Sequence, residues 1–260
     1  MILYGASAAY SIFLLRREHR EHNRLNYFTL LVAFTFHTAA MLMRGFSLER
    51  CPINNLYEAT TFVAWTMTAT YLVIGLWSRL RFLGSFAAPI LFAIGVFALL
   101  TPKDVGAPGR PEFSGGWLTL HVAMFALAYG AFGLSSVAGL MYLTQERDLK
   151  LHKMRALFSL MPPIQRLELV IRTLLISGFV LLTGALVVSA VFMQQQGRPL
   201  TADFKILWSL FVWALYCALI VMRWKFWRGG RRFAWGSIAA FAFVLLTFWG
   251  SSLMSPMHRP

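Results

Sequence analysis

The chain has 260 residues, of which 58% are hydrophobic and only 13% are charged, and its mean hydropathy is +0.62. Soluble domains are about 45–50% apolar and about 25% charged, so this composition excludes an ordinary soluble globular protein. The net charge of +14 does not indicate nucleic-acid binding. The basic residues cluster between apolar runs, as membrane topology requires, and no aromatic groove pattern accompanies them.

The apolar residues form eight runs, and a membrane-spanning helix needs about 20 such residues. In chain order the runs cover residues 1–15, 25–43, 60–78, 83–101, 117–143, 169–193, 205–222 and 234–253. The first run lacks a basic start and a cleavage site with small residues, so we expect it to stay in place and not to be removed as a signal peptide. The sequence predicts an all-α, polytopic integral membrane protein with about eight transmembrane helices in one domain over residues 1–260.

Lysine and arginine are unevenly divided between the alternating connections, and this bias sets the orientation of a membrane protein. One set of connections holds sixteen of these residues and the other holds seven. The richer set is expected in the cytoplasm, which places both chain termini on the non-cytoplasmic side. The outer segments are then 44–59, 102–116, 194–204 and 254–260, and the longest cytoplasmic connection is 144–168.

Three of the six histidines are predicted to lie on the outer side. His121 is four residues into the fifth run, His37 is near the outer end of the second, and His258 follows the last. Neutral imidazoles are common metal ligands, and two of them can hold a haem iron from both sides. Position alone leaves a second interpretation open, in which His37 and His121 bond to neighbouring helices and His258 is idle. The remaining histidines are expected on the cytoplasmic surface, namely His19, His22 and His152.

Other catalytic chemistry has little support in the sequence. Carboxylates are scarce on the outer segments, and there is no H-E-x-x-H, P-loop or G-x-S-x-G motif. No C-x-x-C motif exists, and Cys51 and Cys217 are badly placed to bridge each other. The apolar runs also lack the chain of acidic residues that an ion pump needs. Hydrolase, nucleotide-driven and thiol chemistry are therefore not expected.

The segment before the third run has two interpretations. Pro52, Asn54 and Asn55 predict a turn, and Tyr57 and Glu58 then begin the third run. In one interpretation Glu58 is only a helix-start carboxylate that the helix dipole favours. In the other, the turn and these side chains form a structured lip beside a ligand pocket.

Four segments of the chain, in order, resemble the CcsA/ResC proteins of cytochrome c assembly. CPINNLYEATTFVAW is similar to the family's P-x-x-N-L-Y-E segment, and WLTLHVAMFALAYGAFGLSSVAGLMYL to its W-L-x-x-H-V span. PPIQRLELVIRTLLISGFVLLTGALVVSAVF resembles the family run that contains L-E and G-F, and FHTAAMLMRG its histidine-to-arginine segment. The resemblance covers residues 25–258.

The resemblance implies haem handling in a bacterial inner membrane. The family's two external histidines fall on His121 and His258, which would ligate the iron of haem b. Aromatic, polar and charged residues near them would complete the site, with arginines pairing with the propionates. The candidates are Trp117, Trp208, Asp203, Asn55, Tyr57, Glu58, His37, and Arg44, Arg50 or Arg110.

The resemblance also implies partners. These are a second membrane subunit of the CcsB/ResB type, apocytochrome c, and a thioredoxin-like thiol reductant, with the bilayer around the spans. The chain is expected to present haem for attachment and not to be an enzyme by itself, except as part of a cytochrome c haem-lyase complex.

Two departures from the family pattern favour a second hypothesis. Asp203, Lys205 and Trp208 keep the spacing at the end of the family's tryptophan-rich external motif, but the preceding tryptophans are missing. Counting from Trp208, the histidine that the family places within the seventh span corresponds to Val221. The shorter HemX-like and YpjD-like members lack the tryptophans too, so an accessory or regulatory role in haem biosynthesis is the alternative. A small-solute transporter is a third hypothesis.

Overall fold

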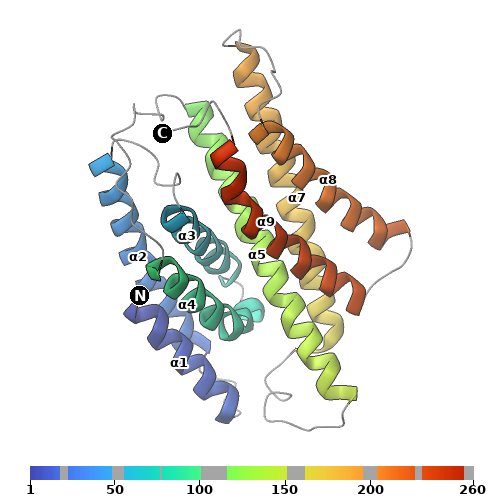
Figure 1. Ribbon diagram of the computed structural model, residues 1–260. Coiled ribbons are helices and arrows are strands. Elements are labelled where there is room, and N and C mark those ends of the chain that lie inside the picture. The colour runs from blue at the N-terminus through green and yellow to red at the C-terminus, as the bar shows by residue number, and fades with distance from the viewer. Residues whose placement is uncertain are drawn as a thin grey trace.

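The computed structural model describes residues 1–17, 23–48, 56–76, 78–100, 116–150, 162–195, 204–225 and 230–254. These residues are helical almost throughout, in eight α-helices and one 3-10 helix (Figure 1). The elements are α1 Ile2–Arg17, α2 Asn23–Leu48, α3 Leu56–Ile74, η2 Ser78–Leu83, α4 Gly84–Leu100, α5 Gly116–Lys150, α7 Ile164–Gln195, α8 Phe204–Lys225 and α9 Arg231–Met254. The prediction of an all-α protein is confirmed.

Five stretches of the described residues are long and apolar enough to cross a membrane. They are Arg24–Ser47, Leu80–Leu100, Leu120–Lys150, Ile164–Gln194 and Ile206–Lys225. Large apolar side chains also cover much of the outer surface of the bundle, as on α2 and α8. Such surfaces are stable against lipid tails and not against water, so the chain is a polytopic membrane protein.

Several predicted boundaries are corrected by the structure. The third run was expected to continue to residue 78, but α3 ends at Ile74 and η2 follows it. The segment 144–168 is not a connection over its whole length, because α5 continues to Lys150 and α7 begins at Ile164. A salt bridge of 2.7 Å between Lys150 and Glu146, one turn apart, supports the polar end of α5. Hydropathy marks the lipid-facing length of a helix, whereas polar turns extend the helix beyond it.

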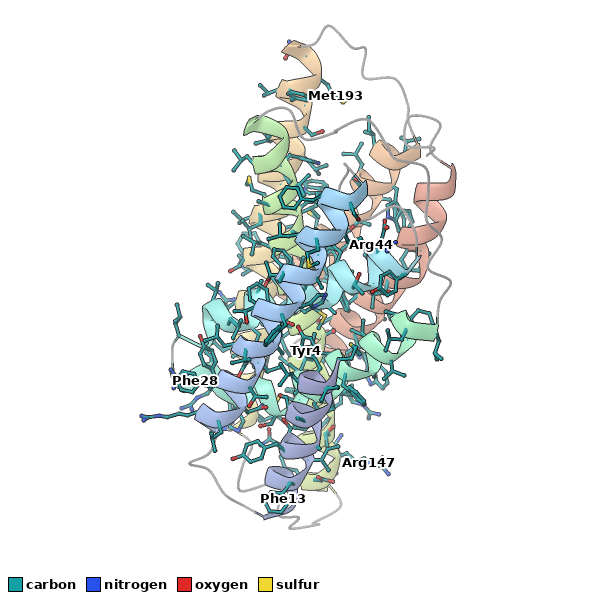
Figure 2. The ribbon with its side chains drawn as sticks, turned by 90° about the vertical axis from the view of Figure 1, so that its left-hand side faces the viewer. Tyr4, Phe13, Phe28, Arg44, Arg147 and Met193 are labelled. Atoms are coloured by element: carbon teal, nitrogen blue, oxygen red, sulfur yellow. The ribbon has the colours of Figure 1, made fainter. Side chains whose placement is uncertain are left out.

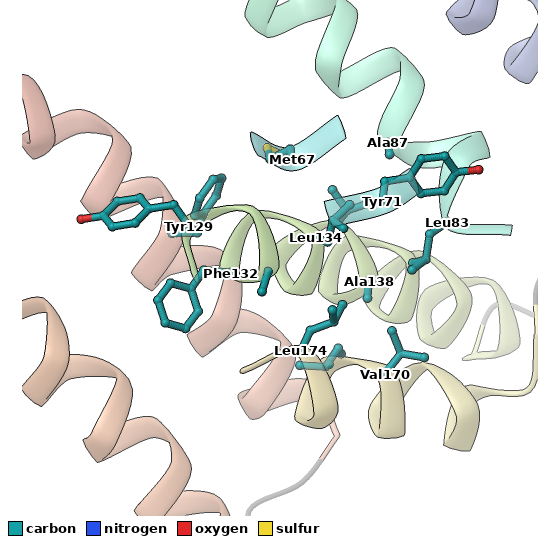
Figure 3. Packing of buried hydrophobic residues seen from close by; sticks show 14 of the residues in the cluster. Met67, Tyr71, Leu83, Ala87, Tyr129, Phe132, Leu134, Ala138, Val170 and Leu174 are labelled. Carbon is teal, nitrogen blue, oxygen red and sulfur yellow. The ribbon is translucent and has the colours of Figure 1, made fainter. Parts of the chain in front are cut away.

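The long helix α5 is the centre of the bundle (Figure 1). The helices α1 to α4 lie on one side of it and α7 and α8 on the other, while α9 crosses it. Buried apolar side chains from both sides meet on α5, as Figure 3 shows for Met67 and Tyr71 of α3 and for Val170 and Leu174 of α7. The Phe132 ring of α5 stacks on the Tyr216 ring of α8, with 3.6 Å between centroids.

Glycines on α5 let the neighbouring backbones approach closely, because helices in lipid associate through small residues. A Cβ atom on Gly130 would lie 2.5 Å from the Thr66 carbonyl oxygen of α3. At Gly139 the contact is milder, with a Cβ 3.1 Å from the Ala234 carbonyl oxygen of α9. The α3–α5 contact therefore depends on Gly130 more strictly than the α5–α9 contact depends on Gly139.

We expect Gly130→Ala to lower the free energy of unfolding by about 1–3 kcal/mol, because a backbone oxygen cannot move aside for the added methyl group. Gly139→Ala is the matched control and should cost less. The measurement is the midpoint of thermal unfolding in detergent. Equal midpoints for the two variants would contradict the close approach of α3 to α5.

Candidate haem-binding site

Most of the helix ends that flank the predicted outer segments lie toward one end of the molecule, whereas α4 ends near the middle of its height. The end of α2 and the starts of α3, α5 and α8 are in the upper part of Figure 1, with the ends of α7 and α9. Figure 2 shows Met193 near this end and Arg147 at the opposite one. We call the end that includes Met193 the upper end of the bundle.

His121 lies in the second turn of α5 at the upper end, and its ring is half-buried. Its Nδ1 atom is 2.8 Å from the carbonyl oxygen of Ala185 in α7. A carbonyl oxygen only accepts hydrogen bonds, so Nδ1 carries the proton and donates it. The lone pair of the neutral ring is then on Nε2. A backbone carbonyl that fixes the tautomer in this way is the usual second partner of a metal-ligating histidine.

Aromatic rings line α5 and the neighbouring helices below this point. The His121 ring is 5.6 Å from the ring of Phe125, which stacks on Tyr129 at 5.0 Å. The ring centroid of Trp208 in α8 lies 5.7 Å from that of Phe211 in the same helix. It also lies 5.7 Å from that of Phe243 in α9. The indole Nε1 atom of Trp208 is buried and has no hydrogen-bond partner among the described residues. This donor is available to a ligand that offers an acceptor.

The upper end of α2 is joined to the start of α3 by a partly buried ion pair. Arg44 Nε donates to Glu58 Oε1 at 2.9 Å, and Arg44 Nη2 lies 2.8 Å from the same oxygen. The Glu58 side chain is fully buried, whereas that of Arg44 is 25% exposed. The Arg44 guanidinium lies 5.3 Å from the centre of the Tyr57 ring. Arg44 is therefore already neutralised by Glu58, and a propionate would share it.

His37 lies in α2 on the other side of α5 from α8 (Figure 1). It lines a cavity among the first four helices and lies 3.1 Å from the hydroxyl of Tyr4 in α1. The structure does not bring His37 to His121. Val221, at the family's intramembrane histidine position, is 42% exposed on α8, which lies across α5 from the helix that holds His37.

Several predicted site residues lie outside the described residues. They are His258, Asp203, Asn55, Arg50 and Arg110. Trp117 is in the first turn of α5, and its backbone alone is described. Sequence reasoning missed Tyr4 and Ala185, which bond to His37 and His121 from other helices, and Thr68, which bonds to Tyr4. No local pattern marks them, because each partner is 31 or more residues away from its histidine.

A family model for the cytochrome c assembly protein matches residues 53–258. The chain belongs to the cytochrome c assembly protein family. The match includes α3 to α9 and therefore His121, Trp208 and the tail that holds His258. The resemblance seen in the sequence motifs is thereby confirmed at the level of the family.

Individual relatives within this family carry two different names. Over 104 residues the chain is 38% identical to a cytochrome c biogenesis protein CcsA of a Synechococcus species, which is 39% of this chain but only 30% of that protein. Protein HemX of Brevibacillus brevis is 25% identical over 252 residues, which are 96% of this chain and 92% of HemX. A CcsA of Prochlorococcus marinus is 27% identical over 250 residues, covering 87% of this chain and 80% of the relative.

Proposed function

We propose that this membrane protein binds haem b at the upper end of the bundle, with His121 and His258 as axial ligands, and presents it to apocytochrome c. The observation that carries the proposal is the bond from His121 Nδ1 to the Ala185 carbonyl, which leaves Nε2 free to ligate iron. The residues present suit a haem, since a buried Trp208 N–H and an aromatic surface lie on the neighbouring helices.

The packing of α5 against α9 supports the pairing of the two histidines. The helices are antiparallel, with the hydroxyls of Ser135 and Ser237 2.9 Å apart. Fourteen residues back along α5 is His121, and the same number forward along α9 is Ser251. His258 is seven residues further on, and an extended chain reaches at most about 3.5 Å per residue. The register therefore allows both imidazoles to approach one iron.

The protein's part in this function is to bind and to orient. His121 and His258 would hold the iron, Trp117 and Trp208 would pack on the porphyrin, and Arg44, Arg50 or Arg110 would pair with propionates. Asn55, Tyr57, Glu58 and Asp203 would shape the surrounding rim. The haem iron supplies the redox chemistry, and its potential depends on these ligands.

The membrane orientation that we propose for the site follows from the uneven distribution of lysine and arginine between the connections. The side richer in lysine and arginine is cytoplasmic in a bacterial inner membrane, so the upper end of the bundle and both termini face outward. Eight spans fit this orientation, because an even number returns the chain to the same side. Apocytochrome c, a CcsB/ResB-type membrane subunit and a thioredoxin-like reductant would then meet the protein on that side.

The second candidate function is an accessory or regulatory role in haem biosynthesis. The observation that favours it is the alignment with HemX, which extends over almost the whole of both chains. A small-solute transporter has less support, since Glu58 is the one carboxylate within the described upper half of the bundle and it is paired with Arg44.

Gene deletion distinguishes the two candidates. If the protein presents haem, deletion should abolish covalent haem staining of c-type cytochromes and leave tetrapyrrole enzyme levels unchanged. The regulatory role predicts the reverse. For the direct test, the protein is purified from haem-replete cells, and a Soret band at about one haem per chain is expected. A preparation without haem would exclude the presentation role.

A further inference from the structure

A cavity of about 250 Å³ lies among α1, α2, α3 and α4, away from the His121 site. Small side chains leave this space, including Ala33, Ala40, Ala64, Gly95 and Ala98. Phe36 and Leu99 also line it and are 66% and 48% exposed, so the cavity reaches the lipid-facing surface of the bundle. A ligand that enters here is expected to come from the membrane.

The polar side chains that line this cavity are Tyr4, His37, Tyr57 and Thr61, and the tautomer of His37 follows from a chain of hydrogen bonds. Thr68 Oγ1 donates its one proton to the Ala64 carbonyl at 2.7 Å. The Tyr4 hydroxyl, 3.2 Å from Thr68 Oγ1, must then donate to that oxygen. It is left to accept from His37 Nδ1 at 3.1 Å. His37 therefore carries its proton on Nδ1 and keeps the lone pair of Nε2 for another partner.

The size and chemistry of the cavity restrict the ligand. Pockets for drug-sized ligands measure about 300–1,000 Å³, so this one suits a single ring better than a four-pyrrole macrocycle. The Nε2 atom of His37 accepts a hydrogen bond, and no other bond to His37 is present among the described residues. The partner must therefore carry a donor such as a hydroxyl. A lipid-soluble ring that carries a hydroxyl group would meet these requirements.

We infer that the cavity binds the head group of a membrane quinol, whose ring hydroxyl donates to His37 Nε2. Ala33, Phe36, His37 and Ala40 form one stripe of α2 at helical spacing, and Tyr57 completes the lining from α3. The isoprenoid tail would leave past Phe36 and Leu99 into the lipid. This site shares Tyr57 with the rim of the proposed haem site, but quinol binding here does not require that haem is bound.

The same hydrogen-bond chain predicts a preference for the reduced ring. An oxidised quinone has only carbonyl acceptors, so it would need the proton of His37 on Nε2. Tyr4 would then have to donate to Nδ1, and its bond to Thr68 would be lost. The loss of one buried hydrogen bond corresponds to a preference for the quinol of roughly fivefold to tenfold in Kd.

The test measures binding of decylubiquinol and decylubiquinone to the full-length protein in phosphatidylcholine nanodiscs without oxygen. Ala40→Leu fills the cavity, and its neighbour Ala39→Leu, which does not line it, is the matched control. We expect saturable binding of quinol to the wild type and to Ala39→Leu, and at least roughly tenfold weaker binding to Ala40→Leu. Equal binding to both variants, or none to the wild type, would overturn the inference.

A second variant tests the hydrogen-bond chain itself. Thr68→Val removes the acceptor of the Tyr4 proton at nearly constant volume, so Tyr4 becomes free to donate to His37. We expect the variant to bind both forms with a quinol-to-quinone ratio near one. A wild-type preference that is absent, or that Thr68→Val leaves unchanged, would show that the ring occupies the cavity in another way or that a lipid chain fills it.

Discussion

Replacing His121 with alanine is expected to lower the haem content of the purified protein more than about 100-fold. Loss of a group that only orients a metal ligand already costs about 10–100-fold in affinity, and loss of the ligand itself costs more. The measurement is the Soret absorbance per chain, together with haem extracted into acid. His152→Ala is the control, because His152 is predicted on the cytoplasmic side and should not change the spectrum.

Two further substitutions separate ligation from a structural role of His121. His121→Asn keeps a side-chain donor near the Ala185 carbonyl but has no imidazole for iron. His121→Met has no such donor but offers a thioether, which is an axial haem ligand in other proteins. We expect the His121→Asn variant to lose haem. The His121→Met variant should retain part of the haem with a shifted reduction potential. If Asn retains haem and Met loses it, His121 acts through α7 and is not a ligand.

The second large effect is expected at the ion pair that joins α2 to α3. Arg44→Met leaves the Glu58 carboxylate buried without its arginine, and breaking a buried pair in this way costs about 3–5 kcal/mol. Glu58→Gln should cost less, about 1–3 kcal/mol, because the Arg44 side chain is 25% exposed and can turn toward water. The measurement is the free energy of unfolding in mixed detergent micelles.

The double variant Arg44→Met/Glu58→Gln supplies the control for this pair. Its cost should fall below the sum of the single variants, because no uncompensated charge remains. Arg44→Lys keeps the charge but loses the planar fork, so its stability should lie between wild type and Arg44→Met. Additive costs would mean that Arg44 and Glu58 stabilise the bundle independently of each other.

The sequence predicted the helices better than it predicted their ends. Each of the eight apolar runs corresponds to one α-helix, because hydropathy is a property of the run itself. The ends differ where polar residues continue a helix, as at Lys150 of α5, or where a 3-10 turn replaces it, as after Ile74. Those outcomes depend on contacts such as Glu146–Lys150 and not on hydrophobicity.

The candidate site, like the helices, could be predicted from the sequence only in part. The sequence motifs identified His121 and Trp208 as candidate site residues. Both lie within the part of the chain that matches the family model. No feature of the sequence shows that His121 donates to Ala185, 64 residues away, or that Tyr4 and Thr68 orient His37. A hydrogen bond between helices depends on which faces meet, and apolar helices in lipid can pair in many ways with similar hydropathy.

By itself, the sequence determined that this is a helical membrane protein, where its apolar helices lie, and which family its motifs resemble. Only the tertiary structure decided that Arg44 is neutralised by Glu58, that His37 and His121 occupy different sites, and which nitrogen each histidine leaves free. Hydropathy can be read from consecutive residues of the chain. Proton positions and ion pairs, in contrast, depend on atoms of different helices that lie about 3 Å apart.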